Sequence, residues 1–169
     1  GLIKNAVEQG KQAVEYYLKK SYPKSKSKYD LIIVGAGPAG ISASLTAAKN
    51  NLKFLTLEQD SLGGTVFSFP RAKIVMTSPM ELPLWGKVKL VETSKSELLD
   101  LWNNVLTKNK ISINEQEKVV EIVKQDNMFI VKTNHDHYTS NGIILAIGRR
   151  GSPRKLGVPG EDRENVYYR

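Results

Sequence analysis

The chain contains no cysteine and only two histidines among its 169 residues. Without cysteine, a disulfide, an iron–sulfur cluster and a redox-active Cys-x-x-Cys pair are all excluded within this stretch. There is no run of about 18 apolar residues, so no transmembrane segment is predicted. The first residues also lack the pattern of a secretory signal, and we expect a cytoplasmic protein. Any redox chemistry must therefore use a cofactor.

Much of the net charge of +8 comes from five lysines in one short polar stretch, "KKSYPKSKSKYD". A basic protein raises nucleic acid or an anionic surface as a partner. No aromatic ladder accompanies these lysines, so we expect a solvated linker and no nucleic-acid partner. At 40% hydrophobic residues, the chain can bury one core.

Apolar residues recur at three-and-four spacing from Leu2 to about Leu18, which predicts an amphipathic helix. Gly10 lies within the apolar stripe, where it indicates either a close approach of another backbone or a tolerated weak point. We divide the chain into this helix with the basic linker (1–28), one nucleotide-binding domain (29–161), and the start of a linker to a further domain (162–169).

A strand–helix–strand unit opens the main domain. The apolar run Leu31–Val34 predicts a buried parallel strand, and Pro38–Lys49 a helix with proline in its first turn. "LKFLTLE" predicts a second strand. The irregular stretch from residue 61 to 90 is long enough to be either functional or built of short strands of its own, and we expect it to border a ligand.

The second half of the domain is predicted to hold one helix and several strands. Ser94 and Glu97 form a capping-box pattern, and the helix they begin is predicted to end near Asn109. Three strands in a meander should follow, feeding a buried strand from Ile143 to Ile147. Glu115 and Glu117 alternate along this region and are interpreted as a solvated strand edge.

Three glycines after the first strand, Gly35, Gly37 and Gly40, fit the pattern G-x-G-x-x-G. The first allows a sharp turn, the second lets the backbone approach a pyrophosphate, and the third lets the helix lie close to the strand. Glu58, at the end of the second strand, would accept hydrogen bonds from a ribose and disfavour a 2′-phosphate. This context predicts a dinucleotide site, which the spacing alone does not assign to one dinucleotide.

Three segments, "DLIIVGAGPAGISAS", "LEQDSLGGTV" and "ILAIGRRGSPRKLGVPGE", resemble the FAD segment of the thioredoxin-reductase-like pyridine nucleotide disulfide oxidoreductase superfamily. The resemblance implies an α/β fold: a Rossmann-like FAD/NAD(P)-binding domain with a parallel sheet, a three-stranded β-meander and an extra N-terminal helix. It also implies FAD as cofactor, with NAD(P)H expected in the full-length protein. The FAD-binding residues it implies are Gly35, Gly37, Pro38, Ala39, Gly40, Glu58, Gly63, Gly64, Thr65, Val120, Ala146, Ile147 and Gly148.

The chain departs from that family in several places. Asn51 stands where glycine is usual, and Ile147 replaces a common threonine. A second G-x-G-x-x-G is absent, so we expect an NAD(P)H-binding domain outside this stretch, and an electron-acceptor domain and a homodimer are left open. The opening helix is similar to the last helix of such flavoproteins, which makes Leu2, Ile3, Lys4 and Asn5 candidate neighbours of the flavin.

The sequence favours the FAD-binding portion of an NAD(P)H-dependent oxidoreductase whose catalytic residues it does not identify, inactive as a fragment. A non-catalytic flavin- or nucleotide-binding sensor or assembly module is the alternative, and an NAD-binding domain is a third interpretation. His135 and His137 are interpreted as a hairpin turn and no metal site is predicted; Trp85 and Trp102 are interpreted as packing residues. Candidates for a flavin pocket lining are Arg71, Met76, Thr77 and Ser78.

Overall fold

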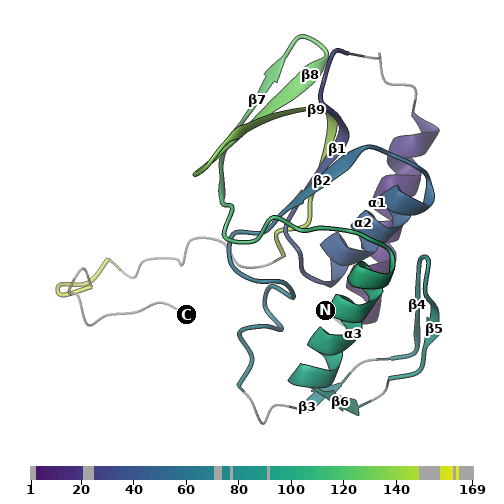
Figure 1. Cartoon of the computed structure of the whole chain (residues 1–169). Coiled ribbons are helices and arrows are strands. Elements are labelled where there is room, and N and C mark those ends of the chain that lie inside the picture. Colours follow the sequence, from purple (N-terminus) through teal and green to yellow (C-terminus); the bar gives the residue numbers. More distant parts are fainter. Residues whose placement is uncertain are drawn as a thin grey trace.

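The computed structural model describes residues 3–20, 25–70, 74–76, 78–90, 92–148, 157–161 and 163. Its elements follow the chain in the order drawn in Figure 1. They are α1 (Ile3–Lys19), β1 (Tyr29–Val34), α2 (Pro38–Lys49), β2 (Phe54–Leu57), β3 (Ile74–Met76), β4 (Met80–Leu82), β5 (Gly86–Val88), β6 (Glu92–Ser94), α3 (Lys95–Lys108), β7 (Val119–Gln125), β8 (Met128–Thr133) and β9 (His137–Leu145). Within these residues, no helix is long and apolar enough to cross a membrane.

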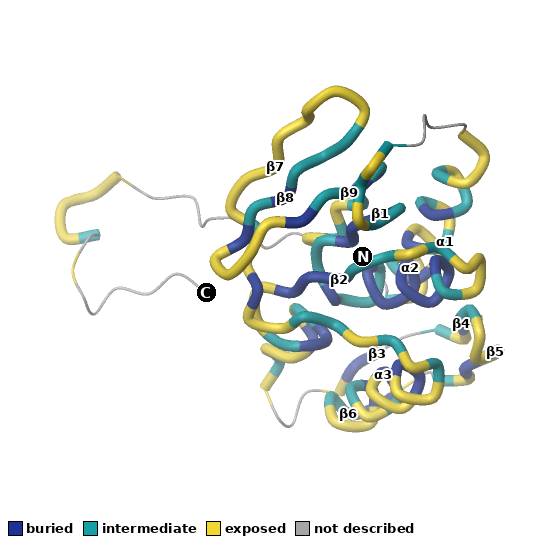
Figure 2. The backbone as a smooth tube through the Cα atoms, turned by 45° about the horizontal axis from the view of Figure 1, so that its top comes forward, coloured by how far each residue is buried: buried dark blue, intermediate teal, exposed yellow. Residues whose placement is uncertain are grey.

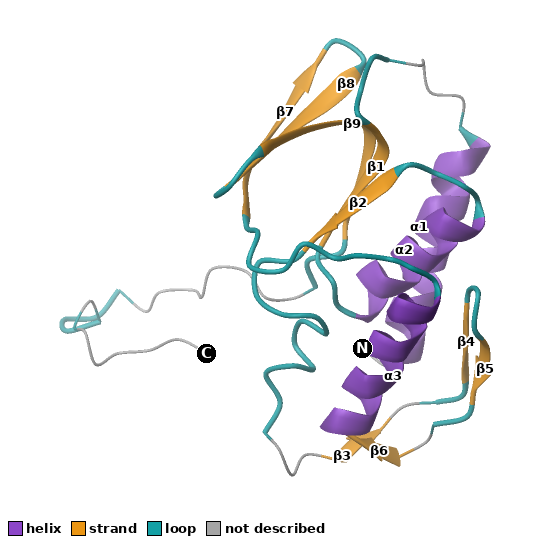
Figure 3. Cartoon of the chain, in the orientation of Figure 1, coloured by secondary structure: helices purple, strands orange, loops and turns teal. Residues whose placement is uncertain are grey.

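A five-stranded sheet in the order β2-β1-β9-β8-β7 forms the centre of the fold. β1 pairs in parallel with both β2 and β9, which confirms the predicted strand–helix–strand unit and parallel sheet. β7, β8 and β9 form the predicted antiparallel meander, labelled in the upper part of Figure 3. The α/β, Rossmann-like architecture with an extra N-terminal helix is therefore confirmed.

One long strand performs two roles that the sequence assigned to separate strands. The first part of β9 pairs antiparallel with β8, and its second part pairs in parallel with β1; Ser140 contacts both neighbours. The prediction of a separate buried strand from Ile143 to Ile147 is therefore wrong: Ile143–Leu145 are the last residues of β9, and Ala146 and Ile147 lie beyond it. Side chains at this end of the strand are exposed to solvent: Leu145 is 61% exposed and Ile147 is 55% exposed.

α2 contacts α1, α3, β1 and β2, and its residues 40–47 are all buried, which Figure 2 shows as a dark blue tube. Its sequence of small residues, "AGISASLTAA", lets neighbours approach from several directions. Inside, the Ser44 hydroxyl donates to Gly40 O (2.8 Å) and lies 2.7 Å from Thr56 Oγ1. These polar side chains are thereby satisfied without solvent.

α1 packs beside α2, as Figure 1 shows, at a point where only glycine fits. A Cβ on Gly10 would lie 2.0 Å from Ala39 O, which confirms the close backbone approach expected there. Val14, further along α1, packs with Ala43 and Ala47 of α2, so the two helices run in the same direction. The amino ends of both helices therefore face the same end of the sheet.

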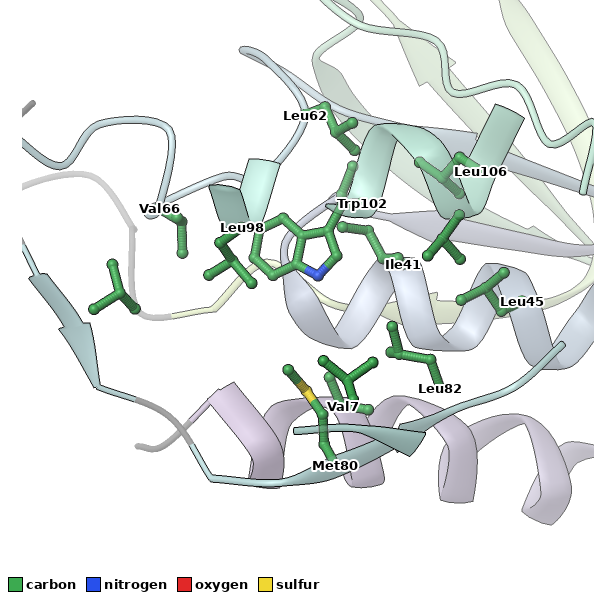
Figure 4. Close-up of a cluster of buried hydrophobic side chains, with 14 residues drawn as sticks. Val7, Ile41, Leu45, Leu62, Val66, Met80, Leu82, Leu98, Trp102 and Leu106 are labelled. Atoms are coloured by element: carbon green, nitrogen blue, oxygen red, sulfur yellow. The ribbon is translucent and has the colours of Figure 1, made fainter. Parts of the chain in front are cut away.

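The largest apolar cluster lies between α1, α2, α3 and the β4–β5 hairpin. Trp102 is fully buried within it, surrounded in Figure 4 by side chains from all of these elements, which agrees with a packing role. Trp85 at the hairpin turn is 37% exposed, with Lys108 Nζ 5.0 Å from its ring centroid. The described part of the irregular stretch 61–90 contains three short strands: β4 pairs with β5, and β3 pairs with β6, which follows the stretch.

The predicted residues at the ends of the helices are also confirmed. The Ser94–Glu97 capping box begins α3, and Asn109 is its C-cap. Hydrogen bonds from the Ser94 main chain, and then from the Thr93 and Ser94 hydroxyls, lower the pKa of Glu97. Asn51 takes the left-handed conformation (φ 55°) expected where the family has glycine.

The last residues of the predicted basic linker are hydrogen-bonded to the main domain. Ser25 and Ser27 both donate to the side-chain oxygen of Asn141, at 2.5 and 2.8 Å, and the main-chain N–H of Lys28 donates to Thr139 Oγ1. Residues 21–24 lie outside the described part of the chain. Residues 25–28 are therefore fastened along β9, which differs from a wholly solvated linker.

Candidate nucleotide-binding site

The glycine turn between β1 and α2 leaves its middle glycine open to the surroundings. Gly37 is the N-cap of α2, followed by Pro38 in the first turn, and it has no side chain to cap the helix. A Cβ on Gly37 would meet nothing within 4 Å. The first helical bond runs from Ile41 N–H to Gly37 O (2.9 Å), so the N–H groups of Ala39 and Gly40 precede the helical ladder. Such a helix start, with the positive end of its dipole, suits an anion.

The other two glycines of the motif are needed for close packing. Gly35 has φ +105°, and a Cβ on it would lie 2.5 Å from Ala146 O. A Cβ on Gly40 would lie 1.8 Å from Gly35 O. Ala146 is in turn held by its N–H, which donates to Val34 O (2.7 Å). The turn formed by Ala146, Ile147 and Gly148 thus begins directly beside the glycine motif.

The glycine pair after β2 contacts the same turn. The N–H of Gly63 donates to Ala36 O (2.9 Å), and a Cβ on Gly64 would lie 3.4 Å from Gly37 Cα. Thr65 follows and is exposed. A segment more than 20 residues distant in the sequence therefore forms one wall of the space beside Gly37.

Glu58, at the end of β2, is bonded to the glycine motif through its side chain. Its Oε2 accepts from Ala36 N–H (2.6 Å) and its Oε1 from Asp60 N–H (3.0 Å), and the residue is only 5% exposed. A carboxylate oxygen has lone pairs for more than one donor, so each oxygen can accept a further hydrogen bond. The acid is thus fixed beside the motif with acceptor capacity remaining.

Val120 lies at an irregularity of the sheet. The register between β7 and β8 shifts between Val119 and Glu121, which leaves Val120 as the extra residue of a β-bulge. Its side chain is 61% exposed. The segment leading to it, residues 114–118, crosses beside the end of β2 and hydrogen-bonds the main chain of Glu58 and Asp60. Val120 therefore directly follows a segment that is hydrogen-bonded to the main chain of Glu58.

The structure brings most of the predicted site residues to one end of the sheet. Gly35 lies against Gly40 and Ala146, Gly64 lies against Gly37, and Glu58 and Gly63 both hydrogen-bond to Ala36 within the motif. Pro38, Ala39, Thr65, Ile147 and Gly148 are their chain neighbours, and Val120 is reached through the crossing segment. Their assignment to a nucleotide remains a prediction.

The other residues named as possible neighbours of the flavin are only partly described by the structure. Ile3 packs against the main apolar cluster, whereas Lys4 and Asn5 are exposed; Leu2 lies outside the described residues. Arg71 and Thr77, and the side chain of Met76, are also outside them, and Ser78 is half-buried. His135 lies in the β8–β9 turn with its Nε2 3.1 Å from Gln116 O.

The interpretation of Glu115 and Glu117 as a solvated edge is wrong. Glu117 is only 6% exposed, and Glu115, although exposed, accepts from the Leu62 N–H (2.8 Å) just before the glycine pair. Alternating acids are typical of an exposed strand edge, but these two residues lie in the crossing segment before β7. No local pattern of the sequence distinguishes the two cases.

Comparison with known proteins places this geometry in a family. Residues 32–169 match the model of the family described as pyridine nucleotide-disulphide oxidoreductase. The chain is 29% identical to a ferredoxin–NADP reductase from Ignicoccus hospitalis, over 82% of this chain and 43% of that protein. It is 31% identical to a thioredoxin reductase from Treponema pallidum, over 80% of this chain and 40% of that protein.

Solved structures show the same fold. A bacillithiol disulfide reductase from Staphylococcus aureus superimposes with a TM-score of 0.68 at 23% identity, covering 79% of this chain and 42% of that one. The chain therefore spans about two fifths of the length of the proteins that it resembles.

Proposed function

The chain belongs to the pyridine nucleotide-disulphide oxidoreductase family, and we propose that it forms the FAD-binding portion of an NAD(P)H-dependent flavin oxidoreductase. The observation that carries the proposal is the joint position of Glu58 and Gly37. A fixed carboxylate lies on one side of the glycine motif, and an open helix start lies on the other. A dinucleotide needs both features at once.

In this proposal, the residues divide between the two ends of FAD. The N–H groups at the start of α2, from Gly37 to Gly40, bind the diphosphate, and Glu58 accepts from the adenosine ribose. Val120 presents its main chain to adenine from the bulge. Gly63, Gly64 and Thr65, together with Ala146, Ile147 and Gly148, lie toward the flavin ring. The absence of any side chain at Gly37 and Gly64 supports a close approach there.

When bound, FAD supplies hydride acceptance and onward electron transfer, which no side chain of this cysteine-free chain provides. The part played by the chain is to bind, orient and shield the cofactor. We place the nicotinamide site outside these residues, because the proteins that the chain resembles are more than twice as long as their matched region, and we leave the electron acceptor open. The acceptor is not a dithiol within these 169 residues.

We further propose the domain boundaries 1–28, 29–161 and 162–169, with α1 as a covering helix at the flavin end. α1 begins seven residues before Gly10, which contacts the start of α2, so its first turn extends beyond that helix by about 10 Å at 1.5 Å per residue. The first turn carries Lys4 and Asn5, both exposed, and no acidic residue. These features support a position beside the flavin.

The proposal is tested by the visible absorption spectrum of the intact protein, followed by anaerobic titration with NADH and NADPH. We expect a flavin spectrum that bleaches with one of the two nucleotides. Bound flavin that neither nucleotide reduces would favour the non-catalytic sensor or assembly module. Thermal protection by NADH and none by FAD would instead indicate an NAD-binding domain and would contradict the proposal.

A further inference from the structure

Glu117 is a buried carboxylate for which the proposed cofactor contacts give no role. It is 6% exposed and lies beside a cluster made by Ile32, Leu57, Val131 and Tyr138, on the sheet face opposite α1 and α2. A buried charge is costly unless several hydrogen bonds compensate for its lost hydration. The surroundings of Glu117 supply that compensation.

Three side chains from three segments surround this carboxylate. Asn114 Nδ2 donates to Oε2 at 2.8 Å, and the Thr133 hydroxyl at the end of β8 donates to Oε1 at 2.9 Å. The third is Tyr138 on β9. Burial, followed by the hydrogen bond and the charge of Glu117, raises the pKa of Tyr138 to about 12. The phenol therefore keeps its proton at neutral pH and remains a donor to the carboxylate.

The main chain of the same segment is bonded to the main chain around Glu58. The Glu117 N–H donates to Glu58 O (2.8 Å), and the Glu58 N–H donates to Asn114 O (2.8 Å). The Gln116 N–H donates to Asp60 O (3.0 Å), with Gln116 in the left-handed region at φ +58°. Both main-chain polar groups of Glu58 thus bond to residues 114–117.

The crossing segment is also held on its other side. The Lys118 N–H donates to Asn134 Oδ1 (2.7 Å), and Asn134 Nδ2 donates to Gln116 O (3.3 Å). Val120 follows two residues later at the bulge. Any shift of the segment would therefore move the main chain at Glu58 and the main chain at Val120 together.

We propose that Glu117 is a positioning residue: its buried carboxylate fixes the crossing segment 114–118 so that Glu58 meets the adenosine ribose and Val120 meets adenine. This inference rests on the proposed function. It separates two acids that look alike in sequence: Glu58 contacts the cofactor, whereas Glu117 acts through Glu58 and the segment beside it.

The experiment compares FAD with its 2′-deoxyadenosine analogue, which lacks one ribose hydroxyl, as ligands of the intact apoprotein. Dissociation constants are measured for the wild type, for Glu117→Gln and for Glu121→Gln. Glu121 is the matched control because it is an exposed acid on the neighbouring strand, paired with Lys132 at 2.6 Å. The ratio of the two constants reports the bond between Glu58 and the ribose hydroxyl.

We expect the wild type and Glu121→Gln to prefer FAD over the analogue by about tenfold, the value of one hydrogen bond to a charged group. In Glu117→Gln, FAD should bind about tenfold more weakly and the ratio should fall toward one. A uniform loss of stability would weaken both ligands equally and leave the ratio unchanged.

The outcomes separate the two proposals. If Glu117→Gln keeps the wild-type ratio, the positioning role is wrong while FAD binding stands. If the wild type binds no FAD, the proposed function fails and this inference fails with it. Should Glu117→Gln not fold, Thr133→Val, which removes one donor at nearly constant volume, is measured by the same criteria.

Discussion

The Glu58 carboxylate accepts a hydrogen bond of 2.6 Å from the main-chain N–H of Ala36, 22 residues earlier in the chain. This bond joins the end of β2 to the glycine turn after β1. In the proposed complex the protein itself holds the acid in place, so little conformational entropy would be lost when the ribose binds. Preorganisation of this kind is typical of a binding site held by rigid strands.

Glu58→Gln should weaken FAD binding by about 10- to 100-fold, the value of one hydrogen bond to a charged group. Glutamine keeps one acceptor oxygen for the Ala36 N–H, but its amide group would then face the Asp60 N–H, which is also a donor. Glu92→Gln, at an exposed acid on β6, is the control and should bind normally. Unchanged FAD affinity in Glu58→Gln, measured by fluorescence titration, would exclude the acid from the site.

Gly10→Ala should destabilise the protein by about 1–3 kcal/mol, the usual cost of overpacking. Helix propensity alone predicts the opposite, a gain of about 1 kcal/mol from replacing glycine in a helix. The added Cβ would lie 2.0 Å from Ala39 O, so α1 must move away from α2. Urea unfolding checks this, with the exposed neighbour Gln9→Ala as a control that should change stability little. A stabilised Gly10→Ala would show that the two helices are not in contact.

Tyr138 should make stability fall at high pH. Its pKa in the folded protein is about 12, above the ordinary value of 10, mainly because of burial and next because of Glu117. Between about pH 10 and pH 12 the unfolded chain has lost the phenol proton and the folded chain retains it. Stability is therefore complete below pH 10 and decreases by up to about 1.4 kcal/mol per pH unit above it.

Tyr138→Phe isolates that effect from the titration of lysines. The difference in unfolding free energy between wild type and variant, followed by urea titration from pH 9 to pH 12, should shrink as the pH rises. A difference that stays constant over this range would show that the phenol titrates normally and has no buried acid beside it.

Local signals in the sequence were sufficient for the elements that begin and end at recognisable residues. Pro38 and the spacing after it gave the bounds of α2, and Ser94 with Glu97 gave the start of α3. The glycine motif and Glu58 were identified because each needs its own residue type at a fixed place relative to β1 and β2. The structure then brought them together as that spacing required.

Features that depend on distant pairing could not be predicted in this way. β9 is one strand that lies between β1 and β8, pairing with β8 along its first part and with β1 along its second, and nothing in "HYTSNGIIL" records this change of partner. The strands β3 to β6 have only three residues each, too few to show an alternating pattern. Glu117 is buried because Thr133 and Asn114 reach it, a contact spanning 16 residues in one case.

The central claim is that the main chain around Gly37 binds the diphosphate of FAD, and a pair of alanine substitutions tests it most directly. Gly37→Ala adds a methyl group to open space, whereas Gly40→Ala places one 1.8 Å from Gly35 O. FAD affinity and melting temperature are measured together for both variants of the intact protein. We expect Gly37→Ala to melt like the wild type but to bind FAD at least about tenfold more weakly, because the methyl group blocks the phosphate. Gly40→Ala should have a lower melting temperature than the wild type. Wild-type FAD affinity in Gly37→Ala would contradict the account.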